Sequence, residues 1–122
     1  MKFWKSLCCA FNGIRKAFQT ERNLRFHFFA AIIVTFSGII LSLSILEWVG
    51  IIFSIGLVIC AELFNTSIEK LVDLFSPQFD KKAGLIKDIS AGAVLFATII
   101  SIIIGLIIFI PKIIFFLKFW FN

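Results

Sequence analysis

Four polar side chains recur at helical spacing near the middle of the chain: Glu62, Asn65, Glu69 and Asp73. At about 100° per residue they lie within an arc of about 80°, so three carboxylates and one amide share a helix face. The fourteen residues before them, 48–61, carry no charge. Acidic groups at the end of such an apolar segment are costly to bury, which favours a functional role. Oxygen ligands of this kind suit a hard cation such as magnesium.

The elements that carry these residues are predicted to be membrane helices. The chain is 61% hydrophobic, with 17 Phe and a mean hydropathy of +1.07, beyond what a soluble domain of 122 residues can bury. The apolar runs 26–46 and 89–110 are each long enough to cross a bilayer. The run from residue 48 reaches that length only by continuing into the polar stripe, to residue 75. We therefore predict an all-α integral membrane protein with three spanning helices in a single membrane domain, 1–122.

Both ends of the chain are predicted to lie at the membrane surface. Residues 1–25 mix Phe, Trp and Leu with six bases, the pattern of an amphipathic helix in the headgroup layer. We expect Pro111 to end the third spanning helix and residues 111–122 to form an interfacial tail. Because bases favour the cytoplasmic side, the N-terminus and the segment 70–88 belong inside and the C-terminus outside. The net charge of +5 thus indicates lipid contact and not nucleic-acid binding.

Several chemistries are excluded by the motifs. The sequence has no Gly-rich phosphate loop, and its three Cys and single His show neither zinc spacing nor a disulfide framework. We expect His27 to be a hydrogen-bonding residue at the membrane interface. Glu21, Lys87 and Asp88 fall at the same predicted membrane level as the stripe, so a magnesium-dependent phosphate site is indicated there. A seam of small residues in the third span predicts close helix packing and self-association: Ala93, Ala97, Ser101 and Gly105.

Three segments resemble the prokaryotic diacylglycerol kinase family. They are residues 20–27, 61–73 and 87–95, and the second contains the motif E-x-x-N-[TS]-[AS]-[IV]-E at 62–69. The resemblance extends over roughly residues 10–112. Within the family, the wording around 21–27 and 69–73 is more similar to the Gram-positive undecaprenol kinase branch than to the proteobacterial diacylglycerol kinases. This resemblance implies a homotrimeric membrane enzyme, with active sites shared between protomers.

The resemblance also implies roles for individual residues. Glu62 matches the general base for the lipid hydroxyl, and Asn65 matches a residue of the same motif that is needed for activity. Glu21 and Glu69 match the carboxylates that hold the magnesium ion bound to ATP. The remaining matches are positions near the nucleotide phosphates (Lys87 and Asp88), a cytoplasmic loop bordering the nucleotide (Gln78, Phe79 and Asp80) and a lipid contact in the surface helix (Arg15).

Simpler interpretations of the same residues remain open. The stripe can serve as hydrogen-bonding glue between helices, and Glu21 can pair with Arg25 one turn later. Lys70 and Asp73 are interpreted as surface charges. For the whole protein, the first hypothesis is an ATP-dependent kinase of undecaprenol in the inner (plasma) membrane, with diacylglycerol as the alternative acceptor. A small oligomeric cation transporter is the alternative from another functional class. The acids of a transporter should lie at mid-membrane, whereas the acids of this chain are predicted to lie at one membrane face.

Overall fold

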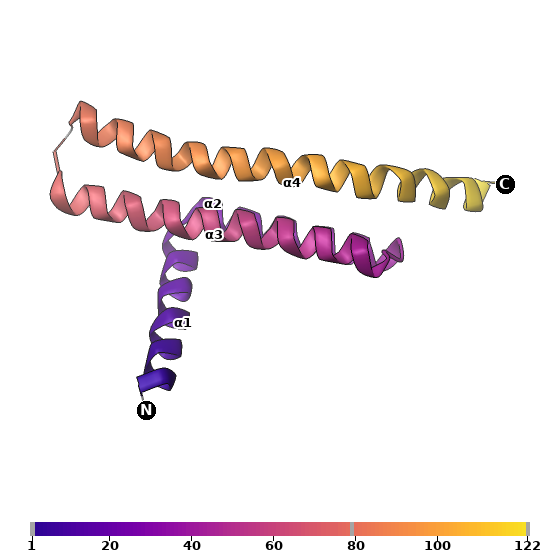
Figure 1. The fold of residues 1–122 in the computed structure, drawn as a ribbon, viewed down its shortest axis with the longest axis horizontal. Helices are drawn as coiled ribbons and strands as arrows, with labels where there is room; N and C mark the ends of the chain where they lie inside the picture. Colours follow the sequence, from indigo (N-terminus) through magenta and orange to yellow (C-terminus); the bar gives the residue numbers. More distant parts are fainter. Residues whose placement is uncertain (1, 79, 122) are drawn as a thin grey trace.

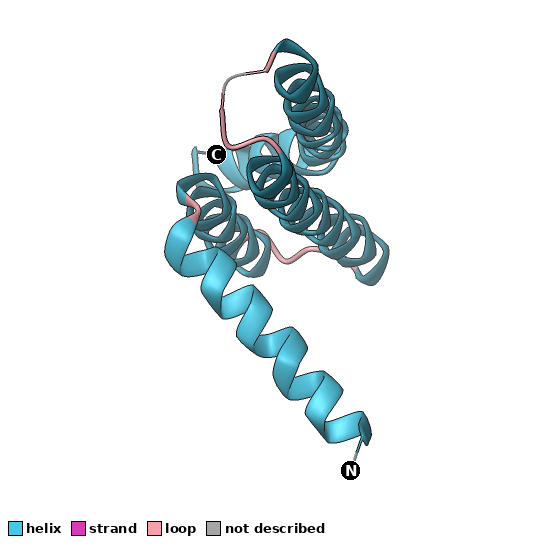
Figure 2. Ribbon diagram, turned by 90° about the vertical axis from the view of Figure 1, so that its left-hand side faces the viewer, coloured by secondary structure: helices cyan, strands magenta, loops and turns pink. Residues whose placement is uncertain are grey.

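The described residues form four helices. The computed structural model describes residues 2–78 and 80–121, and its elements are α1 (Lys2–Thr20), α2 (Arg22–Ile40), α3 (Ile45–Phe75) and α4 (Lys81–Phe121). Helices α2, α3 and α4 run side by side, whereas α1 leads away from them (Figures 1 and 2). By length and composition, α2, α3 and α4 are each able to cross a membrane. The predicted all-α membrane fold is confirmed, and the segments of these helices that lie in lipid stay a prediction.

Helix α3 is the centre of the molecule and packs against each of the other three helices. Its contact with α4 is the most extensive, and two residues of the predicted small-residue seam lie in it. Ala97 is buried, and the Ser101 hydroxyl donates to the Ser54 carbonyl of α3 at 3.2 Å. Small side chains therefore let α4 approach α3 within one chain.

The break between α1 and α2 falls at Glu21. Its backbone is extended (φ −101°, ψ 115°), and the guanidinium of Arg25 donates to the carbonyls of Phe18 (3.0 Å) and Gln19 (2.8 Å) at the end of α1. These bonds satisfy carbonyls that a helix end leaves without partners. The surface helix therefore ends at Thr20, and residues 22–25, which we had expected to be part of it, open α2.

The connection between α2 and α3 comes earlier and is longer than predicted, because α2 ends at Ile40 and α3 begins at Ile45 and not at the predicted residues 46 and 48. A capping box explains the early start: Ser44 N donates to Glu47 Oε2 (2.6 Å), and Glu47 N donates to Ser44 Oγ (3.4 Å). Lys112 of α4 contacts the same carboxylate at 3.1 Å. The turn is thus tied to α4 as well as to the start of α3.

The expectation that Pro111 ends the last helix is wrong. Helix α4 begins at Lys81, before the predicted residue 89, and continues through Pro111 to Phe121. Proline removes one backbone hydrogen bond, but such residues are tolerated in long apolar helices when neighbouring contacts hold the segment. Lys112 provides such a contact, since its ammonium also donates to the Ser42 carbonyl at 3.2 Å.

Replacing Gly38 with alanine tests the packing of the α2–α3 turn. A Cβ at this buried glycine would lie 2.8 Å from Leu43 Cδ1 and 2.8 Å from Trp48 Cη2. We expect Gly38→Ala to destabilise the protein by about 1–3 kcal/mol, the usual cost of overpacking, and to lower its melting temperature in detergent. Gly56→Ala is the matched control, because nothing lies within 4 Å of the added Cβ. Equal melting temperatures for the two variants would contradict this packing.

Candidate active site

The polar stripe of α3 changes from buried to exposed along the helix. Glu62 and Asn65 are 3% and 8% exposed, Glu69 is half-buried and Asp73 is exposed. The buried end therefore lies among the helices, and the exposed end lies toward the connection with α4. The stripe predicted from the sequence is a continuous face in the structure, with its two buried members one turn apart.

The buried carboxylate of Glu62 contacts the imidazole of His27. Glu62 Oε1 lies 3.2 Å from His27 Nε2, and the two side chains are 4% and 17% exposed. His27 comes from α2, so this pair joins two helices. The sequence analysis placed His27 at the interface as a hydrogen-bonding residue and missed its partner. The available signal was its position: it is the only His of the chain and stands six residues after Glu21 in the segment that resembles the kinase family.

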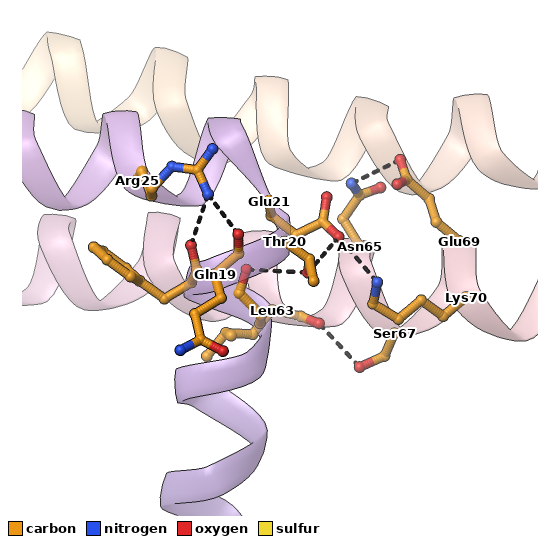
Figure 3. A network of polar contacts seen from close by, with 11 residues as sticks. Gln19, Thr20, Glu21, Arg25, Leu63, Asn65, Ser67, Glu69 and Lys70 are labelled. Carbon is orange, nitrogen blue, oxygen red and sulfur yellow. Dashed lines mark hydrogen bonds and ion pairs between the residues drawn. The ribbon is translucent and has the colours of Figure 1, made fainter.

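Asn65 links the buried and the half-buried parts of the stripe. Its Nδ2 donates to Glu69 Oε1 at 3.1 Å, one turn along the helix (Figure 3). Its Oδ1 is buried and has no hydrogen-bond partner among the described residues, and the same holds for the Ser90 hydroxyl of α4. Both side chains line a hollow of about 400 Å³ between α3 and α4. Buried polar groups are almost always paired, so these atoms offer free hydrogen-bonding capacity at this hollow.

Glu21 is held by a cation from α3. Its Oε1 accepts hydrogen bonds from Lys70 Nζ and from Thr20 Oγ1, each at 3.0 Å (Figure 3). The Lys70 ammonium, helped by the Thr20 hydroxyl, holds the pKa of Glu21 below its ordinary value of 4.5. The alternative pairing of Glu21 with Arg25 is not the one observed, because the Arg25 guanidinium donates to the carbonyls at the end of α1. Lys70, interpreted as a surface charge, is exposed and also joins α3 to the α1–α2 junction.

A second ion pair joins α4 to α3. Lys87 Nζ contacts Asp73 Oδ1, so the exposed end of the stripe reaches a base at the start of α4. Asp88 is exposed beside it. Of the three acids on the stripe, Asp73 therefore has the clearest structural role, since it fixes Lys87 at this end of the molecule.

The predicted nucleotide loop and the predicted lipid contact are less tightly held. Asp80 accepts a hydrogen bond from Lys82 N at 3.0 Å and so caps the start of α4, whereas Gln78 is exposed. Phe79 lies outside the described residues. Arg15 is exposed on α1, the helix that leads away from the bundle. Within the described part of the chain, Gln78, Asp80 and Arg15 make no hydrogen bond or ion pair with the stripe.

The carboxylates of this site suit a metal ion that obtains its other ligands from a bound phosphate compound. Nowhere in residues 2–78 and 80–121 do three His, Cys, Asp or Glu side chains gather closely enough to hold an ion by themselves. Glu69 precedes Lys70 in the chain, and Lys70 holds Glu21, which keeps these two carboxylates in one region (Figure 3). Magnesium commonly takes one or two carboxylates together with substrate phosphates. Glu21 and Glu69 therefore fit a nucleotide-borne magnesium ion.

An apolar cavity borders the His27–Glu62 pair. It has a volume of about 430 Å³ and lies among α2, α3 and α4, with His27 on its wall. Most of its other lining residues are apolar, among them Val34, Ile55, Leu106 and Phe109. A hydrocarbon chain is the ligand class that such a wall accommodates. The buried Glu62 carboxylate thus contacts a residue on the wall of this cavity.

Fold and site together define a small helical membrane protein with an acidic site at one end of its bundle. The family model for prokaryotic diacylglycerol kinase matches residues 8–109, and the chain belongs to that family. It is 45% identical over 111 residues to the undecaprenol kinase of Bacillus subtilis, covering 91% of this chain and 90% of that protein.

More distant relatives are named diacylglycerol kinases. The chain is 36% identical over 103 residues to the diacylglycerol kinase of Synechocystis, covering 84% of this chain and 59% of that protein. It is 29% identical over 94 residues to the diacylglycerol kinase of Escherichia coli K12, covering 77% of each chain. The resemblance noted in the sequence, including its greater similarity to an undecaprenol kinase, is confirmed.

The Glu21–Lys70 pair gives a prediction for pH dependence. Because the folded-state pKa of Glu21 is lowered, the pair is present above pH 4.5 and is lost as the pH falls through the folded-state pKa. We expect Lys70→Met to raise the pKa of Glu21 toward its ordinary value, measured by carbon NMR of labelled Glu21 in detergent. Lys82→Met is the control, since the Lys82 side chain makes no hydrogen bond or ion pair within the described residues. An unchanged Glu21 titration in Lys70→Met would contradict the pairing.

Proposed function

We propose that this protein is a lipid kinase that transfers the γ-phosphate of ATP to the hydroxyl of a membrane lipid alcohol, with undecaprenol as the acceptor. The observation that carries the proposal is Glu62, a stripe carboxylate that is 3% exposed and contacts His27 on the wall of an apolar cavity. A base in that position can meet a hydroxyl whose hydrocarbon tail stays in an apolar environment. The relationship to the Bacillus subtilis undecaprenol kinase supports this acceptor.

In the proposed reaction, Glu62 accepts the proton of the lipid hydroxyl. The hydroxyl oxygen then forms a bond to the γ-phosphorus as the bond from that phosphorus to the β,γ-bridging oxygen breaks, leaving ADP. Phosphoryl transfer needs positioning and neutralisation of charge more than covalent participation by the protein. Lys87 and the nearby Asp88 are assigned to the phosphate end of ATP, and Gln78, Phe79 and Asp80 to the border of the nucleotide.

We assign Glu21 and Glu69 to the magnesium ion that ATP carries. When bound there, magnesium would offset the charge that develops on the phosphate oxygens during transfer. Asn65 has two parts in this arrangement. Its amide nitrogen orients the Glu69 carboxylate at 3.1 Å, and its unpaired Oδ1 remains available in the hollow toward α4.

Two other functions are weaker. Diacylglycerol is the alternative acceptor, favoured by the names of the more distant relatives. A cation transporter needs acids with access from both sides of the membrane. The half of α3 before Glu62 instead buries Ile51, Ser54 and Val58 against its neighbours and carries no charge between Trp48 and Ala61. An acidic site at one end of an apolar helix suits transfer at a membrane surface better than conduction.

We further propose a homotrimer in the inner (plasma) membrane with active sites shared between protomers. The N-terminus and the site would face the cytoplasm, where ATP is present, and the C-terminus would lie outside. Large apolar side chains cover the outer faces of α2, α3 and α4, which leaves surface for both lipid and other protomers. Arg15 on the exposed basic helix α1 is assigned to the lipid substrate.

The proposed reaction is tested by assaying the purified full-length protein in detergent with ATP, magnesium and either undecaprenol or diacylglycerol. We expect phosphorylated lipid from the wild type, with undecaprenol preferred. Glu62→Gln should lower kcat at least about 100-fold, because loss of a general base typically costs 10²–10⁴. Glu47→Gln, the same change near the opposite end of α3, is the control and should keep the rate. A Glu62→Gln variant at full rate, or a wild type that phosphorylates neither lipid, would refute the proposal.

The metal assignment is tested by magnesium titration of the same assay. We expect Glu69→Gln and Glu21→Gln to raise the magnesium concentration that gives half-maximal rate by about tenfold, since each removes one of two carboxylates. Asp73→Asn is the comparison, because Asp73 contacts Lys87 and is not assigned to the metal. If all three variants show the wild-type magnesium dependence, the assignment of Glu21 and Glu69 fails.

A further inference from the structure

We propose that His27 is a positioning residue for Glu62, holding the carboxylate in the orientation in which it accepts the proton of the lipid hydroxyl. This inference rests on the proposed kinase function and adds a residue to it. The sequence motifs assigned His27 no part in the reaction. The observation behind the proposal is the contact of 3.2 Å between His27 Nε2 and Glu62 Oε1 across two helices.

The burial of Glu62 makes this contact necessary. A carboxylate with 4% of its side chain exposed has lost nearly all of its water, and a buried charged group without a partner is strongly unfavourable. Among the described residues, the polar contact of the Glu62 carboxylate is with His27. Glu21 and Glu69 also act on Glu62 through their charges, but both are acidic and neither can donate a hydrogen bond when ionised. The donor must therefore come from α2.

In this geometry the two oxygens of the Glu62 carboxylate have different roles. An imidazole Nε2–H can donate one hydrogen bond, and in the proposed arrangement it donates to Oε1, the oxygen that Nε2 contacts at 3.2 Å. A carboxylate keeps further lone pairs on both oxygens, so Oε2 stays available to a substrate hydroxyl. In this arrangement the proton of the lipid hydroxyl passes to Glu62, while His27 retains its own Nε2 proton throughout. His27 thus acts through Glu62, in the way that orienting partners fix other reactive side chains.

The surroundings of His27 fix its own orientation. The Phe26 ring meets the imidazole edge to face, with ring centroids 5.7 Å apart. The imidazole also forms part of the wall of the apolar cavity among α2, α3 and α4. A hydrocarbon chain in that cavity would bring its end group to the His27–Glu62 pair. Side chains with few alternative rotamers at such a junction hold a reactive geometry at low entropic cost.

The test compares three substitutions of His27 in the full-length protein purified in detergent. His27→Gln keeps an N–H donor near the position of Nε2, His27→Leu removes it at similar volume, and His27→Asn keeps an amide that is one methylene shorter. For each variant, kcat and the KM for ATP are measured with undecaprenol and with diacylglycerol, together with the melting temperature. Thr35→Val is the control, because it removes a polar group from the same helix away from the pair.

We expect His27→Leu to lower kcat about 10- to 100-fold, the usual effect of removing an orienting partner, with the KM for ATP unchanged. His27→Gln should keep most of the wild-type rate, and Thr35→Val should keep it fully. If His27→Leu does not fold, an active His27→Gln beside a slow but folded His27→Asn supports the proposal. Equal rates for the Gln and Asn variants, a wild-type rate in His27→Leu, or equal losses in His27→Gln and His27→Leu would overturn it. A wild type inactive on both lipids refutes the kinase function itself.

Discussion

The burial of one carboxylate on an apolar helix is the constraint on which the rest of this structure depends. Glu62 is 3% exposed on α3, and an ionised group in that environment is tolerated only when a donor replaces the water it has lost. His27 meets this requirement only if α2 lies against α3 in one register. A shift of α2 by a single residue would rotate the imidazole by about 100° away from the carboxylate. The hydrogen-bonding requirement of Glu62 thereby fixes the register of α2 against α3.

That register is set where the chain turns from α1 into α2. The extended backbone at Glu21 ends α1, and Arg25 satisfies the carbonyls exposed there, so α2 begins at a defined residue. Lys70 then ties Glu21 to α3, two turns beyond Glu62. Leu24, in the first turn of α2, is fully buried. The proposed base and the proposed metal carboxylates are therefore held by one junction, which explains why the acidic residues lie at one end of the bundle.

The sequence predicted what depends on local pattern. The 3.6-residue period identified the stripe containing Glu62, Asn65 and Glu69, and the apolar runs identified three long helices. It did not predict contacts between distant segments, such as the His27–Glu62 pair, because periodicity describes one helix at a time. Helix ends were also misplaced where tertiary contacts override local signals. Lys112 anchors α4 beside Pro111, and the capping box at Ser44 starts α3 early.

The two bases near the stripe show how a site can be both stable and able to bind an anion. Lys70 and Lys87 each contact a carboxylate, Glu21 and Asp73 respectively, and both pairs are partly exposed to water. Exposed ion pairs contribute little to stability, so exchanging a carboxylate for a phosphate oxygen costs little. In the proposed reaction, the magnesium ion that accompanies ATP would offset the charge of Glu21, which is assigned to that ion. Because the His27–Glu62 pair is buried, it cannot exchange partners in this way. This suits the proposed role of Glu62, which must keep one geometry while Lys70 and Lys87 change partners.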